Sequence, residues 1–471
     1  MSDSITSNEW DGDVLNRKKY SVFLTNYLKN KNEAYVININ APWGTGKTFF
    51  LKKWYADIEK NHPAVYFNAW ENDYSNDPLV SIISTIKQKI IPLLPKDVQQ
   101  THAAKIFLTN SGKMLKKLTP ILIKGAMSKA IGTEGVQNLF DVSSEDDDTL
   151  SDLSSKFAEE LLSSHETISN SIGAFKNSID LLVTEVTSTG VLNPPLFVFI
   201  DELDRCRPLY SIELLERIKH IFNIPCVVFI VATDTEQLSH SVKAIYGEGF
   251  NGEIYLRRFF DQIFTLPEPN CIEFTTLLFK EFIPNAKYFD YYVNSQGNSV
   301  NKNEYTLTSK VIDNVELILL FTLFAKFFKL DLRSKKQCFD RFVAIEKSLT
   351  DKEDLHFGYL IFLIMLDAKH PNKFNKYFTC NNIAQRNQLI VDFEDTFDNL
   401  TIYREQITAK NIIDKYTRIV FLTGKEIRAF EQNLKIDDDF DSVLFLSLYK
   451  NHKSIIKYKE RVEMVETLNS F

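Results

Sequence analysis

The chain has 471 residues, of which 44% are hydrophobic and 25% charged, and its formal net charge at pH 7 is −7. This length and composition predict a globular protein of two or three domains, because a single core rarely grows so large. The negative charge excludes a generally basic surface, so nucleic-acid binding would need a local patch.

The cysteines and the apolar stretches indicate the setting of the chain. Five scattered cysteines without a CxxC pair argue against a disulfide framework or a zinc site and favour a reducing compartment. Residues 1–30 lack the apolar segment of a signal peptide. The stretches 118–132 and 359–366 are interrupted by lysine or shorter than the roughly 18 apolar residues of a membrane span. We therefore expect a soluble, cytoplasmic protein with no membrane partner.

The first part of the chain alternates helix and strand patterns. Apolar residues at helical spacing predict a helix over 13–28, and the β-branched run at 34–40 predicts a buried parallel strand. After a glycine-bearing turn, we expect a helix from Lys47, a strand at 63–70 and a helix at 77–94 that Asp77 and Pro78 open.

Residues 95–190 interrupt this alternation and predict a helical insertion. A lysine-rich segment with a helical pattern extends from Lys105 to Lys124, and a second segment with a helical pattern ends near Val183. Between the two, the acidic, serine-rich stretch 143–152 predicts a solvated, mobile loop.

Strand and helix patterns then resume. We expect strands at 195–200 and 226–232, a helix at 211–222 and another helix that runs into 255–269. Alternation of this kind predicts an α/β fold, in which a parallel sheet is flanked by helices on both faces. Beyond Pro269, the sequence has a helical pattern to its end. The expected parts are the first part of the α/β core (1–94), the helical insertion (95–190), the second part of the core (191–270), a helical lid (271–345) and an all-helical C-terminal domain (346–471).

The turn after the first strand, APWGTGKT, has the pattern of a phosphate-binding loop. Glycines let backbone N–H groups face phosphate oxygens, the following helix adds its positive end, lysine neutralises the phosphates and threonine binds Mg²⁺. The first glycine of the motif is replaced by Ala41, which fits if its φ is negative. A glycine turn with a surface lysine is the alternative. The candidate nucleotide-binding residues are Trp43, Gly44, Thr45, Gly46, Lys47, Thr48 and Phe49.

A second segment, PLFVFIDELDRCRP, predicts an apolar strand that ends in Asp201 and Glu202. On a strand beside the loop, Asp201 would hold Mg²⁺ together with Thr48, and Glu202 would orient or deprotonate the attacking water. The alternative, a surface acidic cluster that caps a helix, leaves the six preceding apolar residues unexplained.

A third strand ends in Thr233 and Asp234, where a polar side chain would lie between the carboxylate and the γ-phosphate. The alternative role is capping of the next helix by Asp234 or Thr235, and the two roles do not exclude each other.

Together these stretches resemble the KAP family of P-loop NTPases, relatives of the AAA+ and STAND groups. The resemblance extends over residues 13–345 and implies a P-loop NTPase sheet. Many relatives carry transmembrane helices between loop and carboxylates, whereas this chain resembles the soluble branch. It departs from the family at Ala41 and at Glu202, where a second aspartate is common. The stretches that carry the resemblance are APWGTGKT (41–48), YFNAWENDYSNDPLVSII (66–83), VFIDELDRCRP (198–208), VVFIVATDTEQL (227–238) and YLRRFFDQIFTLPEP (255–269).

The resemblance also implies roles for arginines. Arg258, ahead of Arg257, would be a finger that reaches the nucleotide of a neighbouring subunit, with a helix-end charge as the alternative. Arg333 would contact the γ-phosphate from the lid, with a solvated helical residue as the alternative. Arg205 and Arg207 would brace the acidic pair or the lid. For Trp70, we favour a place in the core over a ligand contact.

The motifs and the resemblance predict a Mg²⁺-dependent ATP hydrolase that acts as a conformational switch in a homo-oligomer, with Lys47 on the β and γ phosphates. Relatives occur in phage defence, and residues 345–471 resemble no effector site, so we expect a separate effector protein. Two alternatives stay open. One is a nucleotide-bound oligomeric scaffold that does not hydrolyse ATP, and the other is a DNA-associated motor that uses the lysine-rich face at 105–124.

Overall fold

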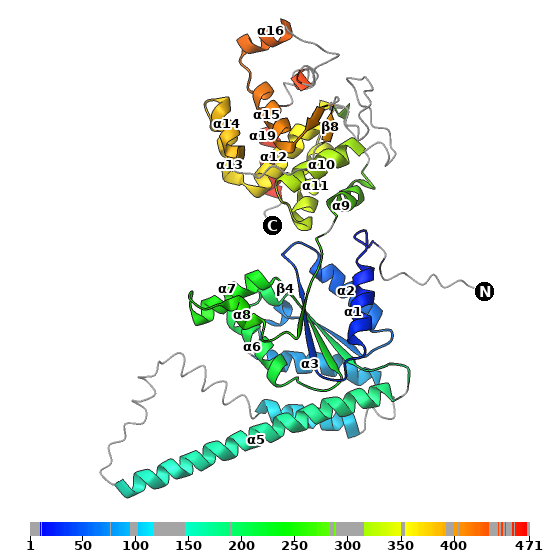
Figure 1. The fold of residues 1–471 in the computed structure, drawn as a ribbon, viewed down its shortest axis with the longest axis vertical. Coiled ribbons are helices and arrows are strands. Elements are labelled where there is room, and N and C mark those ends of the chain that lie inside the picture. The colour runs from blue at the N-terminus through cyan, green and yellow to red at the C-terminus, as the bar shows by residue number, and fades with distance from the viewer. Residues whose placement is uncertain are drawn as a thin grey trace, which may run out of the picture. The chain divides into compact units, whose positions relative to one another are not determined.

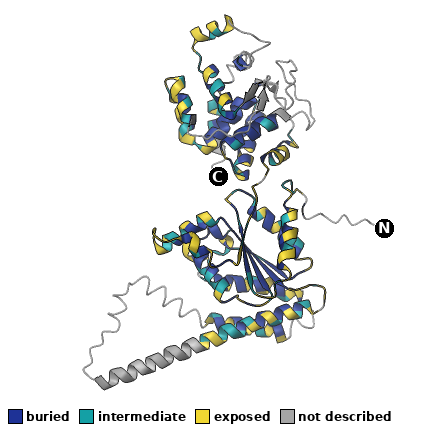
Figure 2. Cartoon of the chain, viewed as in Figure 1, coloured by how far each residue is buried: buried dark blue, intermediate teal, exposed yellow. Residues whose placement is uncertain are grey.

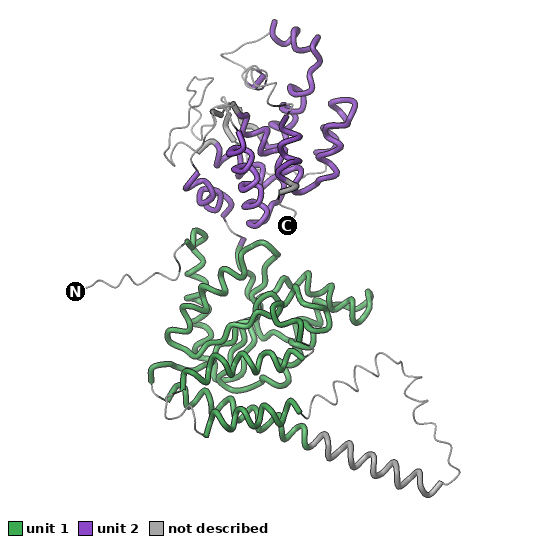
Figure 3. Tube along the Cα trace, turned by 180° about the vertical axis from the view of Figure 1, so that it is seen from behind, with its two compact units in different colours: residues 1–267 green, residues 268–471 purple. Residues whose placement is uncertain are grey.

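The structure is a computed structural model of the chain, and the chain divides into two compact units, Met1–Pro267 and Glu268–Phe471 (Figures 1 and 3). The residues that it describes are 10, 12–75, 77–94, 102–116, 147–188, 190–268, 270–282, 287–288, 315–349, 354–391, 400–402, 405–432, 441, 444–445, 448, 455 and 457–468.

The first unit is built on a parallel sheet with the strand order β2-β3-β4-β1-β5. The strands are β1 (Tyr35–Asn40), β2 (Ala64–Asn68), β3 (Leu196–Asp201), β4 (Val227–Thr233) and β5 (Gln262–Thr265). Helices cover both faces of the sheet, so every residue of β3 and β4 is buried (Figure 2). This explains why the sequences of these two strands are almost continuously apolar. The predicted α/β class with a parallel sheet is confirmed.

Alternate strand residues point into two separate cores. On one face, Phe197 and Phe199 pack with α1 (Lys18–Leu28) and α2 (Lys47–Ile58). On the other face, Val198 and Ile200 pack against helices of the α/β core and against the insertion. The helices of the α/β core on this face are α3 (Pro78–Ile90), α6 (Pro208–His220), α7 (Thr235–Tyr246) and α8 (Gly252–Leu256). The 3-10 turns η1 (Trp70–Asn72), η2 (Ile91–Leu93) and η3 (Leu203–Arg205) belong to the same unit.

The insertion packs on the second of these cores. Residues 102–116 are helical, and α5 (Asp147–Thr187) follows. The Phe175 ring lies 6.2 Å from Phe107 and 5.7 Å from Phe222 of the core, so the insertion is joined to the first unit.

Two local expectations for the first unit are wrong. Residues 147–152 of the acidic stretch begin α5 instead of forming a loop, since acidic residues are favourable at a helix N-terminus; residues 143–146 lie outside the described part. The helix expected to run into 255–269 ends at Leu256, and β5 follows. Asp261 ties this segment to the edge of β1, because its backbone N donates to Val36 O and its Oδ2 accepts from Val36 N, both at 2.8 Å.

The second unit is mainly helical and has one apolar core. That core combines residues of the expected lid, such as Phe342, with residues of the expected C-terminal domain, such as Tyr416 and Val462, so the two share their packing. Its helices are α9 (Cys271–Phe279), α10 (Val315–Phe327), α11 (Leu332–Lys347), α12 (Phe357–Lys369), α13 (Pro371–Thr379), α14 (Ile383–Val391), α15 (Ala409–Val420), α16 (Gly424–Gln432) and α19 (Tyr458–Leu468). Short strands pair β6 (Lys287–Tyr288) with β7 (Asp354–Leu355) and β8 (Leu400–Ile402) with β9 (Glu405–Ile407).

The two apolar stretches that the sequence singled out do not give a membrane span within the described residues. Residues 359–366 belong to α12, which has 13 residues and is buried in the second unit, and residues 118–132 lie outside the described part. None of the helices in the described ranges has the length and apolar character that crossing a membrane requires.

Candidate nucleotide-binding site

The loop between β1 and α2 has the backbone that its glycines predict. Gly44 and Gly46 adopt positive φ values of 76° and 86°, a conformation that costs a residue with a side chain more than it costs glycine. Gly46 is the N-cap of α2, which therefore begins at Lys47 with its positive end at the loop. This is the local geometry of an anion site.

Ala41, the departure from the motif, is a packed residue. It is 1% exposed, belongs to the same apolar cluster as Ile39 and Phe50, and donates its backbone N to Thr233 O at 3.1 Å. Among the residues that the structure describes, it is not one of those with a positive φ. The condition under which alanine fits this position is therefore met.

Lys47 is held by the loop itself. Its Nζ donates to Ala41 O at 2.6 Å and to Pro42 O at 3.2 Å, and it lies 3.7 Å from Asp204 Oδ2. Burial lowers the pKa of Lys47, while the nearby carboxylates, Asp204 foremost, act in the opposite direction. The ammonium group thus lies close to the loop in a mostly buried, acidic environment.

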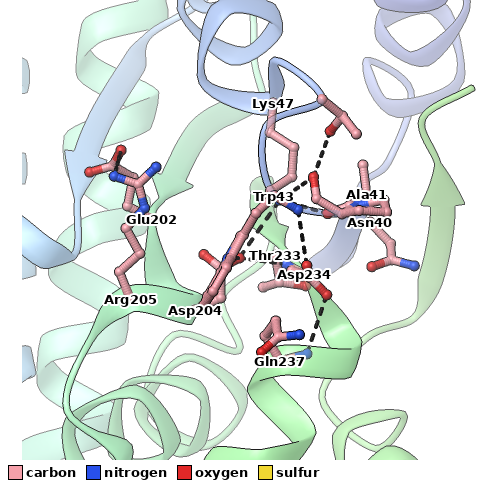
Figure 4. A network of polar contacts seen from close by, with 12 residues as sticks. Asn40, Ala41, Trp43, Lys47, Glu202, Asp204, Arg205, Thr233, Asp234 and Gln237 are labelled. Carbon is pink, nitrogen blue, oxygen red and sulfur yellow. Dashed lines mark hydrogen bonds and ion pairs between the residues drawn. The ribbon is translucent and has the colours of Figure 1, made fainter. Parts of the chain in front are cut away.

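Asp204 joins the loop to the acidic segment, and the sequence reasoning did not select it. Its Oδ2 accepts from Trp43 Nε1 at 2.7 Å and from Asp234 N at 2.8 Å (Figure 4). Trp43 is fixed a second time, because its backbone N donates to Asp234 Oδ2 at 3.0 Å. The one available signal was a third acid in DELDR, three residues after Asp201.

The residues after β4 support the loop in different ways. Asp234 accepts from Gln237 N through Oδ1 at 3.2 Å and so caps α7, which confirms the capping alternative. The Thr233 hydroxyl is fully buried and donates to Asn38 Oδ1 at 2.9 Å, so it bridges β4 and β1 within the sheet. The structure therefore places Asp234, and not the Thr233 hydroxyl, against the loop.

The sheet order corrects the expected neighbourhood of the acid pair. The strand of Asp201 does not lie beside the strand of the loop, because β4 lies between β3 and β1. In a parallel sheet all three strands end at the same edge, so the loop, Asp234 and the acid pair still share it.

Asp201 and Glu202 have different surroundings. Asp201 is 1% exposed, and its carboxylate accepts from Tyr66 OH at 2.6 Å and from Glu202 N at 2.9 Å. The pKa of Tyr66 is raised, first by burial and then by the Asp201 charge, so the phenol stays a donor to this carboxylate.

Glu202 has a strained backbone and an occupied carboxylate. Its φ of 60° and ψ of 27° lie in the left-handed region, which is uncommon for a residue other than glycine. Arg205 Nη1 lies 2.8 Å from Oε1, and Asn68 Nδ2 donates to Oε2 at 3.2 Å. Arg205 also lies over the Trp70 ring at 5.9 Å from its centroid.

The segment FNAWEND (67–73) has Phe67 and Ala69 in the core but not its tryptophan. Trp70 is 54% exposed, so its expected place in the core is wrong. Asn68 Oδ1 accepts from the backbone N of Trp70 and of Glu71, which turns the chain away from the sheet after β2. Arg207 pairs with Asp73 at 2.9 Å, so it braces this turn, whereas Arg205 braces Glu202.

The sequence matches the KAP family P-loop domain over residues 17–319. The chain belongs to the KAP family. The match begins at Arg17, ahead of the sheet, and includes the loop, the insertion and the acid pair. Membership supports a nucleotide-dependent activity.

Other comparisons of this KAP family chain give less. No curated protein matches it. Among solved structures it is similar to PCH-2 of C. elegans, with 13% identity, 81% of this chain and 71% of that chain covered, and a TM-score of 0.28. It is also similar to the ORC2 protein of Aeropyrum pernix in ADPNP-ADP complexes (10% identity, 95% and 94% covered, TM-score 0.33) and in the ADP form (10%, 98% and 94%, 0.31). Similarity at this level carries no inference about activity.

The remaining loop residues of the KAP chain are placed as follows. Thr45 Oγ1 donates to Pro42 O at 2.7 Å, and Thr48 is half-buried in the first turn of α2. Phe49 is 39% exposed, and Lys53 lies over its ring. A second residue that the sequence reasoning missed, Arg17, donates to the backbone of the loop.

The donors at this edge fit Mg²⁺ bound together with a nucleotide. Within the described ranges no group of three or more His, Cys, Asp or Glu side chains could hold a metal alone. Mg²⁺ characteristically uses one or two protein oxygens plus substrate phosphates and water. The Thr48 hydroxyl and the buried Asp201 carboxylate are oxygen donors of that kind, and we regard them as the candidate ligands.

The predicted arginines lie in different units. Arg257 and Arg258 are exposed in the turn after α8, and no ion pair is recorded for either within the described part of the chain. Arg333 is exposed in the first turn of α11, in the second unit. A finger role for Arg258 and a lid role for Arg333 stay predictions.

Proposed function

We propose that this protein is a Mg²⁺-dependent ATP hydrolase that works as a conformational switch. One observation carries the proposal. The phosphate-loop lysine is buried against Asp204 within a polar network that includes Trp43 and Asp234, and the acid pair at the end of β3 lies at the same edge of the parallel sheet. A glycine turn with a surface lysine would have no reason to bury Lys47 against these carboxylates.

Each residue has a proposed task. The N–H groups of the loop and Lys47 would hold the phosphates, and Thr48 with Asp201 would hold Mg²⁺, which when bound neutralises phosphate charge. Glu202 would orient the attacking water and accept its proton. Asp234 and Asp204 would position the loop, because their carboxylate oxygens accept hydrogen bonds from Trp43, a residue of the loop.

With these contacts, Glu202 would be in a state that does not hydrolyse ATP. A carboxylate whose two oxygens are occupied by Arg205 and Asn68 is not free to take a proton from water, since both contacts restrict its orientation. Turnover would therefore require Glu202 to part from Arg205. This supports a switch whose hydrolysis is controlled.

Nucleotide binding is tested by the affinity of a fluorescent ATP analogue for the purified protein. Lys47→Ala should weaken binding by roughly a hundredfold, because it removes a charge-assisted contact worth about 3 kcal/mol. Lys52→Ala is the matched control, since Lys52 is exposed on the same helix and should leave the affinity unchanged. Equal affinity of the wild type and Lys47→Ala would contradict the proposed site.

A homo-oligomer is part of the proposal. The exposed Arg258, without a recorded ion pair in the described residues, is available to a neighbouring copy, and Arg333 would serve the nucleotide from the second unit. The mass of the particle, measured with and without ATP and Mg²⁺, should rise with nucleotide for the wild type and less for Arg258→Ala. A monomer under both conditions would remove the finger role.

We further propose a role in bacterial antiphage defence with a separate effector protein, which rests on the family association alone. Cells that carry the wild type should resist phages that cells with Lys47→Ala do not resist. Equal plaque numbers across a broad phage panel would refute this role and leave the enzymatic proposal intact.

A second candidate function is a nucleotide-bound scaffold without turnover. The observation that favours it is the strained Glu202 backbone with its carboxylate held by Arg205. Tight ATP binding without multiple-turnover phosphate release would select the scaffold.

A further inference from the structure

Arg17 is a buried arginine that binds the phosphate loop from behind. It is 2% exposed and is the N-cap residue of α1. Its Nη2 donates to Thr45 O at 2.6 Å and its Nη1 donates to Gly46 O at 3.0 Å. Burial lowers its pKa and Asp13 acts against that shift, but a guanidinium stays protonated in proteins.

These two carbonyls determine where two N–H groups point. In a trans peptide the C=O of one residue and the N–H of the next lie in one plane and point in opposite directions. Carbonyls turned toward Arg17 therefore direct the N–H groups of Gly46 and Lys47 away from it. Phosphate-binding loops use N–H groups of this part of the turn.

We propose that Arg17 is a positioning residue of the nucleotide site. It fixes the peptide group of Thr45 and, together with the hydrogen bond that Phe50 N donates to Gly46 O at 3.1 Å, the peptide group of Gly46. The N–H groups of Gly46 and Lys47 are therefore oriented before a nucleotide arrives. Preorganised donors bind more tightly, because their ordering does not have to occur on binding. This inference rests on the proposed function, since it requires that the loop binds phosphate.

The position of Arg17 also links the loop to the docking of α1. Leu24 and Leu28 of α1 are buried in the cluster that contains Phe50 of α2, and Trp54 Nε1 donates to Thr25 Oγ1 at 2.8 Å. The guanidinium reaches the loop only while this helix is docked. Nucleotide binding and helix docking should therefore strengthen each other by the same factor.

The test compares three variants in the full chain. Arg17→Met removes both donors, and Arg17→Lys keeps the charge with a single ammonium group. Thr25→Val, the matched control, removes the hydrogen bond between α1 and α2 and leaves the Arg17 contacts in place. For each variant, we would measure the dissociation constant of a fluorescent ATP analogue with Mg²⁺ and the Tm without nucleotide.

We expect Arg17→Met to bind roughly tenfold or more weakly, since two hydrogen bonds of a charged donor are lost, and Arg17→Lys to lie between it and the wild type. Thr25→Val should lower Tm without a matching loss of affinity. If Arg17→Met fails to fold, Arg17→Lys decides. In the wild type, nucleotide should also slow hydrogen exchange in Lys18–Leu28.

Two failures are distinguishable. Wild-type protein that binds no nucleotide would refute the proposed function and this inference with it. Wild-type binding combined with unchanged affinity in Arg17→Met and Arg17→Lys, or with α1 exchange that nucleotide does not alter, would refute the role of Arg17 and leave the proposed function standing.

Discussion

The two halves of the candidate site are held in different ways. In the loop half, Lys47, Trp43, Asp204 and Asp234 are joined by hydrogen bonds and an ion pair in which the side chains of Lys47 and Asp204 are 10% and 2% exposed. In the acid half, Glu202 is held by Arg205, whose side chain is 32% exposed. A partly solvated pair is weaker and easier to exchange than a buried network.

This difference suggests a division of labour. We infer that the loop half can bind a nucleotide almost as it stands. Only the contacts of Lys47 with the loop carbonyls and with Asp204 would have to rearrange. The acid half, in contrast, would have to change before hydrolysis, because Glu202 carries both backbone strain and two side-chain partners. Variants of the acid half should therefore change turnover, and variants of the loop half should change nucleotide affinity or stability.

A gain in turnover is expected from Arg205→Gln in the acid half. Loss of a partly exposed ion pair worth about 1 kcal/mol should free Glu202 and raise the kcat for ATP hydrolysis about fivefold, with little change in ATP affinity. Steady-state phosphate release measures this. Arg207→Gln is the control, because Arg207 pairs with Asp73 and not with Glu202. A kcat that falls in Arg205→Gln would instead make Arg205 a required part of the site.

A smaller effect is expected from Ala41→Gly in the loop half. Glycine removes a buried methyl group and loosens the backbone, so Tm should fall by about 2–4 °C, corresponding to roughly 1 kcal/mol. Ala232→Gly, in the same apolar cluster, should lower Tm similarly. Neither variant should raise turnover. A large gain in hydrolysis in Ala41→Gly alone would show that alanine holds the loop back.

Local sequence patterns were enough to find the sheet and the ends of its strands. The runs that end before Asp201 and Thr233 are apolar because both faces of the sheet are covered. In β1 the one polar residue inside the strand, Asn38, is buried with its side chain hydrogen-bonded to Thr233 and Thr235. The loop glycines likewise required positive φ values that the structure has.

The parts that sequence reasoning missed depend on contacts between distant residues. Asp204 meets Trp43 across 161 positions of the chain, and Arg17 meets Gly46 across 29, so no local spacing reveals either pair. The short strand β5 becomes a strand because it pairs with β1. Trp70 is exposed because Asn68 turns the chain outward, a choice that its aromatic character alone does not predict.

The most direct test of the central claim is multiple-turnover phosphate release by Glu202→Gln at saturating ATP and Mg²⁺, measured beside its ATP affinity. We predict release at least a hundredfold below that of the wild type, since a general base contributes on the order of 10²–10⁴ in rate, with affinity retained. Release at the wild-type rate, or no release from the wild type itself, would contradict hydrolysis through Glu202.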